Sequence, residues 1–470
     1  MVTEGLSISA YIAIPVVLSL LLKGDNIKVS VVKDVSQEYI EQQAIAPSPQ
    51  LISTKTTGKT YYVSGKGNDK NKGLSTSSPF RTIQKAANLT KPGDTVLVMN
   101  GVYTNASPNG EVVSITRSGT ANAWIKFKAY PGHSPKIRHN GWHGILIHNG
   151  ASYIEVNGFE VIGNNANVTL DYAMSQKSNR SNPLTNGNCI SVNGRQKGHP
   201  HHIRIVNNKT HSCGGGGIGV IESDYVTIDN NVVFDNAWYS IYATSGISML
   251  RNWNFDNYQG YKIFITNNKV YNNRQYIPWI KTGTITDGNG IIIDSLTKAN
   301  DAKFPPYKGR TLVKNNLTFH NGGSGIHAFY SDRVDVINNT AFLNNQTPEL
   351  KLGQIFTHTS SDVKILNNIL YAFPGKNVNS NSRGKNVIFD YNIYLNASSV
   401  NIKGPHDIVA DAEFIRTHPT LRKIAGDWNS ELSKQSRSAP TSIKLNSASL
   451  VCEPVTYSLK GKLIKVGCSR

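Results

Sequence analysis

The chain has 470 residues, of which 39% are hydrophobic, and its 49 Lys and Arg against 30 Asp and Glu give a formal net charge of +19. This content suffices for a long core and favours one elongated domain over three globular ones. A surface this basic favours a polyanion as the partner. Nucleic acid is not expected, because the basic residues are scattered and form no known nucleic-acid-binding motif.

Residues 1–23 are predicted to be a hydrophobic signal or membrane anchor. Within them, residues 6–22 form an apolar run of marginal length for spanning a bilayer, and Pro15 interrupts it. No Lys or Arg precedes the run and no small-x-small cleavage site follows its apolar core, so we expect an uncleaved anchor or an atypical signal. Polar residues 24–58 would be the linker. The protein is therefore expected outside the cytoplasm, as a secreted, periplasmic or membrane-anchored chain.

A short amphipathic helix is expected near the start of the folded part of the chain. Pro79 suits the first turn of a helix, and Pro92-Gly93 ends the pattern. The apolar positions on one face are Phe80, Ile83, Ala86 and Ala87. Such a helix would cover the open apolar end of a stack of strands, which is the architecture that the following repeats indicate.

From residue 150 to 392 the chain repeats a short β-type run that ends in a polar pair, usually two asparagines. The copies end at Asn208, Asn231, Asn268, Asn339 and Asn368, with weaker ones at Asn316 and Asn392. The pair recurs after 23 residues in the most regular part and after 37 or 48 residues where loops are inserted. Such repetition is typical of a solenoid, in which each unit buries its apolar face only against its neighbours.

A second signal sets the register of the repeat. In four copies an isoleucine stands thirteen residues before the second member of the polar pair. These isoleucines are Ile145, Ile218, Ile326 and Ile355. Because Val and Ile alternate with polar residues here, as in a strand with one buried face, the isoleucines are expected to point inward. Asparagine tolerates left-handed turns, and stacked asparagine amides can hydrogen-bond from coil to coil.

Three-strand coils with an asparagine ladder resemble the right-handed parallel β-helix of the pectin-lyase-like superfamily. The opening segment from residue 60, TYYVSGKGNDKNKGLSTSSPFRTIQKAANLTKPGDTVLVMNGVY, is similar to the start of the family-nine pectate lyases. The resemblance implies an all-β fold, a right-handed parallel β-helix over residues 59–445, with the N-terminal helix as its cap. It makes an acidic polysaccharide the natural ligand.

The inward isoleucines predict which side chains share the outer face of one sheet. Strands in such a stack lie about 4.8 Å apart, and alternate residues point outward in columns. The first predicted column is Leu146, Ser191, Gly219, Tyr242, Ile292, His327 and Phe356. The second is His148, Asn193, Ile221, Thr244, Asp294, Phe329 and His358. Tyr242, Asp294 and His327 would then lie on three consecutive coils along one sugar-sized groove.

Loops rich in Trp, Tyr, Arg and Lys leave the same coils at residues 246–261, 274–286 and 296–310. Aromatic rings stack on sugars, and Arg and Lys bind carboxylates, so these loops are predicted to wall the groove. The alternative is that their aromatic residues pack only among themselves. The residues expected to bind substrate are Tyr239, Trp253, Arg274, Trp279, Lys281, Tyr330 and His358.

A lyase acting on an acidic polysaccharide must neutralise a uronate carboxylate, remove the proton at C5 and protonate the leaving oxygen. His327 is the predicted base and Tyr242 its acid or base partner, with Arg274 or Lys281 as the carboxylate clamp. Asp294 is predicted to orient His327 or to bind a cation. The sequence therefore favours β-elimination in a uronate-containing polysaccharide, and we expect a monomeric enzyme.

The family-nine pectate lyases carry a catalytic lysine just after a Gly-Asn-Gly-aromatic phrase, beside several aspartates that bind calcium. The similar phrase here is DGNGIIIDS, beginning at Asp287, and Ile292 stands at the position of that lysine. Only Asp287 and Asp294 remain nearby as metal ligands, so the lysine and calcium mechanism does not carry over. The sequence requires no cofactor, although Ca²⁺ is compatible with these two carboxylates.

Other activities on the same fold make different demands on the sequence. Polygalacturonase-type hydrolases need paired aspartates with G-H-G and R-I-K motifs, and this chain has no adjacent Asp-Asp pair and neither motif. Hydrolysis with that set of residues is therefore disfavoured. A uronate C5-epimerase shares the proton removal of a lyase and would look the same in sequence. A non-catalytic polysaccharide-binding module would not need His327 and Tyr242 together. The basic charge would then serve binding, or only solubility.

The four cysteines fit an oxidising compartment. Cys189 and Cys213 lie about one coil apart, and Cys452 and Cys468 would close a small loop in a C-terminal tail, residues 446–470. Sequence alone does not assign the pairing, and four buried thiols are the alternative.

Overall fold

The computed structural model describes residues 58–294, 305–395, 397 and 400–410, together with the backbone of strands β32 (Val455–Leu459) and β33 (Lys462–Val466), which pair antiparallel. The predicted hydrophobic segment 6–22, nearly all of the linker and the Cys452 and Cys468 pair lie outside the described residues. Within those residues, no helix combines the length and the apolar character needed to cross a membrane.

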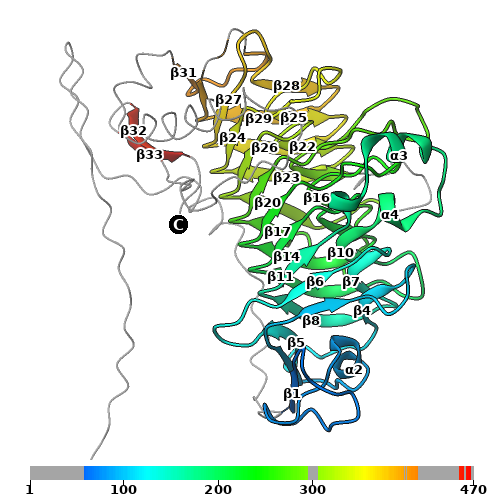
Figure 1. Cartoon of the computed structure of the whole chain (residues 1–470). Helices are drawn as coiled ribbons and strands as arrows, with labels where there is room; N and C mark the ends of the chain where they lie inside the picture. Colours follow the sequence, from blue (N-terminus) through cyan, green and yellow to red (C-terminus); the bar gives the residue numbers. More distant parts are fainter. Residues whose placement is uncertain are drawn as a thin grey trace, which may run out of the picture.

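Three long parallel sheets form the body of the described chain, and successive strands pass from sheet I to sheet II to sheet III (Figure 1). Sheet I contains β4 (Glu111–Ile115), β7 (His143–His148), β10 (Asn188–Asn193), β13 (Ile218–Ile221), β16 (Ile247–Leu250), β19 (Ile291–Asp294), β22 (Ile326–Phe329), β25 (Ile355–His358) and β28 (Asn379–Ser382). Sheet II contains β1 (Thr60–Val63), β2 (Thr95–Val98), β5 (Ile125–Ala129), β8 (Ser152–Asn157), β11 (His201–Val206), β14 (Asp224–Asp229), β17 (Tyr261–Thr266), β20 (Arg310–Lys314), β23 (Asp332–Ile337), β26 (Ser361–Leu366) and β29 (Lys385–Asp390). Sheet III contains β3 (Val102–Thr104), β6 (Lys136–Arg138), β9 (Glu160–Ile162), β12 (Lys209–His211), β15 (Val232–Phe234), β18 (Lys269–Tyr271), β21 (Leu317–Phe319), β24 (Thr340–Phe342), β27 (Ile369–Tyr371), β30 (Ile393–Leu395) and β31 (Ile408–Ala410). The predicted parallel β-helix is thereby confirmed.

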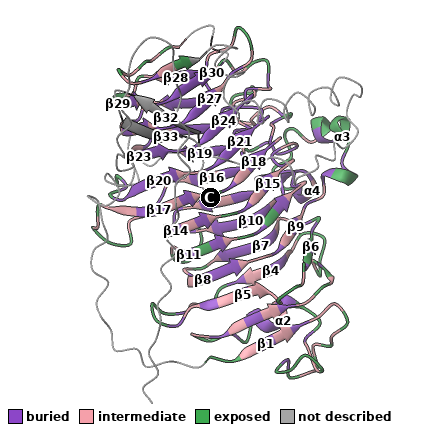
Figure 2. Ribbon diagram, turned by 90° about the vertical axis from the view of Figure 1, so that its left-hand side faces the viewer, coloured by how far each residue is buried: buried purple, intermediate pink, exposed green. Residues whose placement is uncertain are grey.

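The core lies between the three sheets and is filled by inward apolar side chains. Figure 2 shows buried residues along the strands of the stack. One column of aligned partners in sheet II is Ile205, Ile228, Ile265, Val313, Val336 and Ile365. Each of these side chains is at most 1% exposed. In sheet I, Ile218, Ile326 and Ile355 are buried in the same way, so the inward orientation predicted for these isoleucines is confirmed.

The predicted asparagine ladder lies at the turn between sheets II and III. Its members are Asn208, Asn231, Asn268, Asn316, Asn339, Asn368 and Asn392. Each backbone N–H donates to the side-chain Oδ1 of the next member, over 2.8 to 2.9 Å. The residue before each turn supplies the left-handed backbone, as Asn230 does with φ 54°. This ladder satisfies backbone groups that the turn would otherwise bury unpaired.

A second ladder, which the sequence analysis did not identify, lies where the chain leaves sheet III. Asn236, Asn273, Asn321 and Asn344 are linked from coil to coil in the same way, and the backbone N–H of Asn344 donates to Gln354 Oε1. These contacts fix the start of the loops that lead back to sheet I. They therefore help to position the loops beside the outer face of that sheet.

The N-terminal helix α2 (Ile83–Ala87) is shorter than predicted. Thr82 caps it, because its hydroxyl accepts the backbone N–H of Lys85 at 3.2 Å, so Pro79 lies before the helix and not in its first turn. The helix buries Ile83, Ala86 and Ala87 and packs against β1, β2 and β4, at the end of the stack where the described chain begins (Figure 1).

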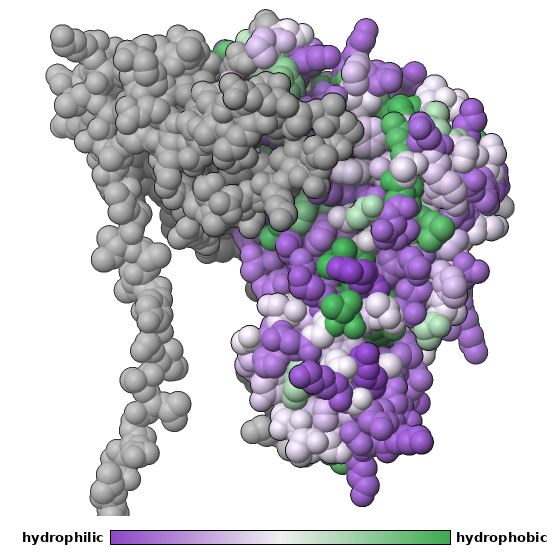
Figure 3. Space-filling model, in the orientation of Figure 1, coloured by the Kyte–Doolittle hydropathy of each residue, from purple (hydrophilic) through white to green (hydrophobic). Residues whose placement is uncertain are grey.

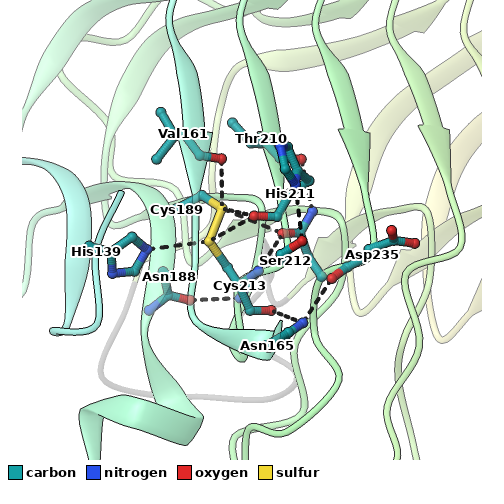
Figure 4. The surroundings of a disulfide bond; sticks show 12 residues. His139, Val161, Asn165, Asn188, Cys189, Thr210, His211, Ser212, Cys213 and Asp235 are labelled. Atoms are coloured by element: carbon teal, nitrogen blue, oxygen red, sulfur yellow. Dashed lines mark hydrogen bonds between the residues drawn. A yellow bond between two sulfur atoms is a disulfide. The ribbon is translucent and has the colours of Figure 1, made fainter. Parts of the chain in front are cut away.

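Cys189 and Cys213, which are 24 residues apart, form a disulfide inside the coil stack (Figure 4). The alternative of free buried thiols is therefore wrong for this pair. His139 lies beside the bond, with its Nε2 atom 3.3 Å from Cys213 Sγ, and Asn165 donates from Nδ2 to the carbonyl of Asp235 at 2.9 Å. The bond ties β10 to the turn that follows β12, next to a long loop inserted in this region.

That loop joins β9 to β10 and carries η1 (Asn165–Asn167), α3 (Leu170–Ser175) and α4 (Pro183–Asn186), which project from one side of the stack (Figure 1). On the face seen in Figure 3, hydrophobic residues form separate patches within a largely hydrophilic surface. The helices belong to the side of the molecule on which the chain returns from sheet III to sheet I, and this placement makes them neighbours of the inserted loops.

Candidate functional site

The outer face of sheet I carries two columns of outward side chains, which we call the sheet I strip. The first column is Leu146, Ser191, Gly219, Ser248, Ile292, His327, Phe356 and Ser380. The second is His148, Asn193, Ile221, Leu250, Asp294, Phe329, His358 and Ser382. The predicted columns are confirmed at every position except those assigned to Tyr242 and Thr244.

The prediction that Tyr242 lies on the strip is wrong. Strand β16 begins at Ile247, so Ser248 occupies the place between Gly219 and Ile292. Tyr242 instead belongs to the loop before β16, is 38% exposed and donates its hydroxyl to a loop carbonyl, that of Arg180, at 3.0 Å.

Tyr242 was misplaced because two isoleucines before or within β16 are equally buried, and only one of them points into the coil. Ile241 and Ile247 are both fully buried, but Ile241 packs in a cluster outside the coil, with Tyr239 and Ile277. Its backbone N–H donates to Asn186 Oδ1 at 3.1 Å, which ties the loop to α4. A pattern of alternating apolar residues indicates that they are buried, but it does not distinguish the core of the coil from a cluster among the loops.

Asp287 lies at the end of the loop that leads into β19. Its backbone N–H donates to Gln275 Oε1 at 2.8 Å, which joins the two ends of that loop. Gly288 follows with φ 81°, and a Cβ atom there would lie 2.5 Å from the backbone nitrogen of Gln275, so this close approach requires glycine. The Asp287 carboxylate accepts hydrogen bonds from Thr286 Oγ1 at 2.9 Å and from Asn289 Nδ2 at 3.2 Å.

The pKa of the Asp287 carboxyl group is raised to about 7. Burial is the largest cause, since it penalises the charged form, and the nearby negative charge of Asp294 adds to it. Asp294 ends β19 in the second column of the strip, aligned with Phe329. The site therefore pairs a carboxyl group that holds its proton near neutral pH with a second carboxylate, an arrangement suited to proton transfer.

His327 lies on the strip as predicted, but its surroundings are those of a packed ring. It is 6% exposed, stacks on Phe356 with ring centroids 4.6 Å apart and meets Phe329 edge-on at 5.4 Å. Neither ring nitrogen has a hydrogen-bond partner within the described parts of the chain, so Asp294 does not orient this ring through a hydrogen bond, contrary to one of its predicted roles. Burial, with the nearby His358, lowers the pKa of His327 to about 3, which makes it a weak proton acceptor.

An aromatic cluster extends from His327 across β22 and β25. The rings of Phe329 and His358 stack with centroids 5.2 Å apart, and Tyr330 contacts both, at 4.7 and 5.5 Å. Phe329, Tyr330 and His358 are partly exposed. The structure thus brings together two of the predicted substrate-binding residues, Tyr330 and His358, one and two strands beyond Asp294.

The loops between sheets III and I hold the other predicted aromatic residues. Tyr239 is 9% exposed and packs against other apolar loop residues. Its surroundings therefore match the alternative in which the aromatic residues of the loops pack among themselves and do not line the groove. Trp279 and Lys281 lie together in the 275–287 loop, with the Lys281 ammonium group 5.3 Å from the indole ring. The backbone N–H of Ile280 donates to Ile241, which stacks this loop on the one before β16.

Arg274, the other predicted carboxylate clamp, opens the same loop. A Cβ atom on Gly322 would lie 2.9 Å from Arg274 Cγ, so the arginine side chain lies along the following coil. Burial lowers the pKa of His320, the residue after β21 of sheet III, and the charge of Arg274 lowers it further. The Arg274 Nε atom is buried and has no hydrogen-bond partner among the described residues. Arg274 therefore borders sheet III at the position where its loop begins.

On the opposite edge of the strip, Trp253 stacks on His199 with ring centroids 4.6 Å apart. The loop that carries Trp253 is anchored by Lys262, which the sequence analysis missed and which is completely buried. The Lys262 ammonium group donates to Asp224 at 2.8 Å and pairs with Asp256 at 2.7 Å. This network holds an aromatic loop at the edge of sheet I, where long loops were predicted.

A cation site at Asp287 and Asp294 would have only these two carboxylates from the segment that contains β19 and the residues before it. Calcium takes about six to eight oxygen ligands, so water or substrate oxygens would supply most of them. Among the described residues, His139, Cys189 and Cys213 are the one group of three such side chains whose ligand atoms lie within 4.8 Å of one another. Their two sulfur atoms are already joined to each other.

Comparison with known proteins gives one family and several structural likenesses. The profile described as Pel9A-like, right handed beta helix region, matches residues 61–355. No curated protein matches the chain. A GH136 lacto-N-biosidase from Eubacterium ramulus is 16% identical, with 75% of this chain and 67% of that one covered and a TM-score of 0.49. Pectate lyase Pel9A is 16% identical, with 72% of this chain and 80% of that one covered and a TM-score of 0.43. A rhamnogalacturonan lyase is 17% identical, with 76% of this chain and 88% of that one covered and a TM-score of 0.41. These likenesses concern the fold alone.

Proposed function

This chain belongs to the Pel9A-like right-handed β-helix family, and we propose that it is an extracytoplasmic enzyme that cleaves an acidic polysaccharide on the sheet I strip. The net charge of +19 supports an anionic substrate, because a basic surface raises the local concentration of a polyanion. The Cys189–Cys213 disulfide supports an oxidising compartment.

The observation that carries the reaction type is the placement of two carboxyl groups at the two ends of β19, with Asp287 in the loop before the strand and Asp294 at its last position. Burial first, and the charge of Asp294 second, raise the pKa of Asp287. Breaking a glycosidic bond requires a proton for the leaving oxygen, and the pKa of Asp287, about 7, lets it hold that proton near neutral pH. Asp294 is the second carboxylate that hydrolysis needs, either to activate water or to attack the anomeric carbon. We infer glycoside hydrolysis, with Asp287 as general acid and Asp294 as base or nucleophile.

β-Elimination is the second candidate, and the presence of His327 on the strip favours it. In that reaction His327 would remove the C5 proton, and Asp287 would still protonate the leaving oxygen. The pKa of His327, about 3, and the position of Tyr242 in a loop weaken this route. C5-epimerisation requires the same base, and a non-catalytic polysaccharide-binding module requires neither carboxylate.

Incubation with pectate, alginate and glycosaminoglycans separates these reactions. Hydrolysis creates new reducing ends without ultraviolet absorbance, whereas elimination creates both reducing ends and an absorbing unsaturated sugar. Epimerisation changes the uronate composition without cleavage, and simple binding changes nothing in the polymer. We expect reducing ends alone. Accumulation of unsaturated products would reject hydrolysis in favour of the second candidate.

Substitution of each carboxylate tests the assigned roles. Asp287→Asn and Asp294→Asn should each lower kcat by a factor on the order of 10² to 10⁴, the usual effect of removing an acid or base group. Asp171→Asn, which alters an exposed aspartate on α3, is the matched control and should keep full activity. Wild-type kcat in the Asp287→Asn variant would remove the general-acid assignment.

A further inference from the structure

The residues that follow the sheet I strands form a third column at the edge of the strip. Tyr330, Thr359 and Arg383 follow β22, β25 and β28, and all three have left-handed backbone angles, with φ of 47°, 47° and 58°. The backbone N–H of Thr359 donates to the carbonyl of Ser382 at 2.8 Å, so the turns of neighbouring coils are in register. This column places the Arg383 guanidinium group next to the coil of His358.

Arg383 is an exposed cation, and the described part of the chain offers it no ion pair or hydrogen bond through its side chain. Other arginines in this region are engaged. Arg310 pairs with Asp335 and Asp362, and Arg333 donates to Gln259 and to the carbonyl of Lys308. The charge of Arg383 also acts on His358, whose pKa it lowers after the larger effect of burial.

The strip is asymmetric on the two sides of Asp294. Toward the N-terminal end of the stack, the first column has the small residues Ser191, Gly219 and Ser248. Toward the other end, Phe329 and His358 present stacked rings in the same column as Asp294. Within the two columns of the strip, a pair of stacked aromatic rings therefore lies on the C-terminal side of the carboxylates, whereas the Trp253 and His199 stack lies at the edge of the strip.

We propose that Phe329, His358 and Arg383 form a uronate-binding subsite, in which a sugar ring packs against the exposed side of the Phe329 and His358 stack and its carboxylate pairs with Arg383. The inference rests on the proposed function, since it assigns the part of the substrate that is held beside the cleaved bond. Apolar contact with the rings binds neutral and acidic sugars alike, whereas the guanidinium group selects the acidic ones. His327, in the neighbouring column, contacts the Phe329 ring edge-on at 5.4 Å.

Binding without turnover tests the subsite directly. The Asp287→Asn chain is titrated by calorimetry with hexasaccharides of galacturonate, mannuronate and glucuronate, and with their carboxyl-reduced counterparts. Arg383→Gln should weaken binding of the preferred acidic ligand about tenfold, the loss of roughly one charge-assisted contact, and leave the carboxyl-reduced ligand unchanged. Phe329→Leu, which keeps an apolar side chain but removes the ring, should weaken binding of both.

Arg81→Gln is the matched control, because it removes an exposed arginine beside α2 at the far end of the stack. If Arg383→Gln binds the acidic ligand as Arg81→Gln does, the subsite is rejected, whatever reaction the enzyme catalyses. If no acidic hexasaccharide binds the parent chain, the subsite and the proposed function both fail. If binding depends on Arg383 but the wild-type protein cleaves no polymer, only the proposed function fails.

Discussion

At the scale of single residues, the chemistry of the site depends on the environment of Asp287. Its carboxyl group is partly buried at the mouth of a loop that Gln275 closes, and Asp294 lies close enough to disfavour its negative charge. An aspartate with an ordinary pKa would be deprotonated at neutral pH and could not serve as an acid. The same environment makes the folded state bind this proton more tightly than the unfolded chain does.

The raised pKa of Asp287 predicts a pH-dependent stability. Because the pKa rises from 3.8 to about 7 on folding, the stabilising effect of proton binding is complete below about pH 4 and is lost as the pH rises through 7. Asp287→Asn removes this dependence and should raise the free energy of unfolding at pH 8, by at most about 1.4 kcal/mol per unit of pKa shift. Melting temperatures from pH 4 to 8 check this; a variant destabilised at pH 8 would contradict the pKa.

His327 gives a residue-scale test between the two reactions. His327→Phe keeps an aromatic ring between Phe329 and Phe356 and removes both nitrogens, for which the described residues provide no hydrogen-bond partner. If His327 only supports the packing, we expect kcat within a factor of about three and an unchanged or higher melting temperature. A fall of kcat by two orders of magnitude or more, in a variant that still melts at the wild-type temperature, would restore His327 as the base.

At the scale of elements, the asparagine ladder holds each turn of the coil to the next. Asn231 accepts the backbone N–H of Asn208 at 2.9 Å, and its amide donates to Ile205 and Asn268. Asn231→Ala leaves these buried groups unpaired and should cost about 2 to 4 kcal/mol of unfolding free energy. Asn230→Gly, a neighbouring exposed position whose φ of 54° suits glycine, should change stability by less than about 1 kcal/mol. Equal losses in chemical unfolding of the two variants would contradict the role of the ladder.

The elements that repeat could be predicted from sequence, and the inserted ones could not. The first ladder is visible because most copies end in a pair of asparagines and every member of the ladder is the second residue of its pair. The second ladder was missed although Asn236, Asn273, Asn321 and Asn344 each stand five residues after a member of the first, a spacing that would have revealed it. The coil between Asn231 and Asn268 carries insertions, so the thirteen-residue offset fails there, and Tyr242 was assigned in place of Ser248.

At the scale of the whole molecule, the register of sheet I determines which residues, distant in sequence, lie side by side on its outer face. Knowing that Ile218, Ile326 and Ile355 point inward suffices to align His327 and Asp294 on the outer face of sheet I. Their alignment was predictable because it depends only on strand periodicity. Their chemistry was not, since the burial of His327 and the coupling of Asp287 to Asp294 depend on loops whose course the repeat does not determine.

The central claim is that the sheet I strip hydrolyses an acidic polysaccharide through Asp287 and Asp294. Mass spectrometry of the oligosaccharides released from a polyuronate in water labelled with heavy oxygen tests it most directly. We predict saturated products, with one labelled oxygen at each newly formed reducing end. The Asp287→Asn variant should release these products more slowly than the wild type, by a factor on the order of 10² to 10⁴. Products that lack one water and carry no label would show elimination instead and would contradict the account.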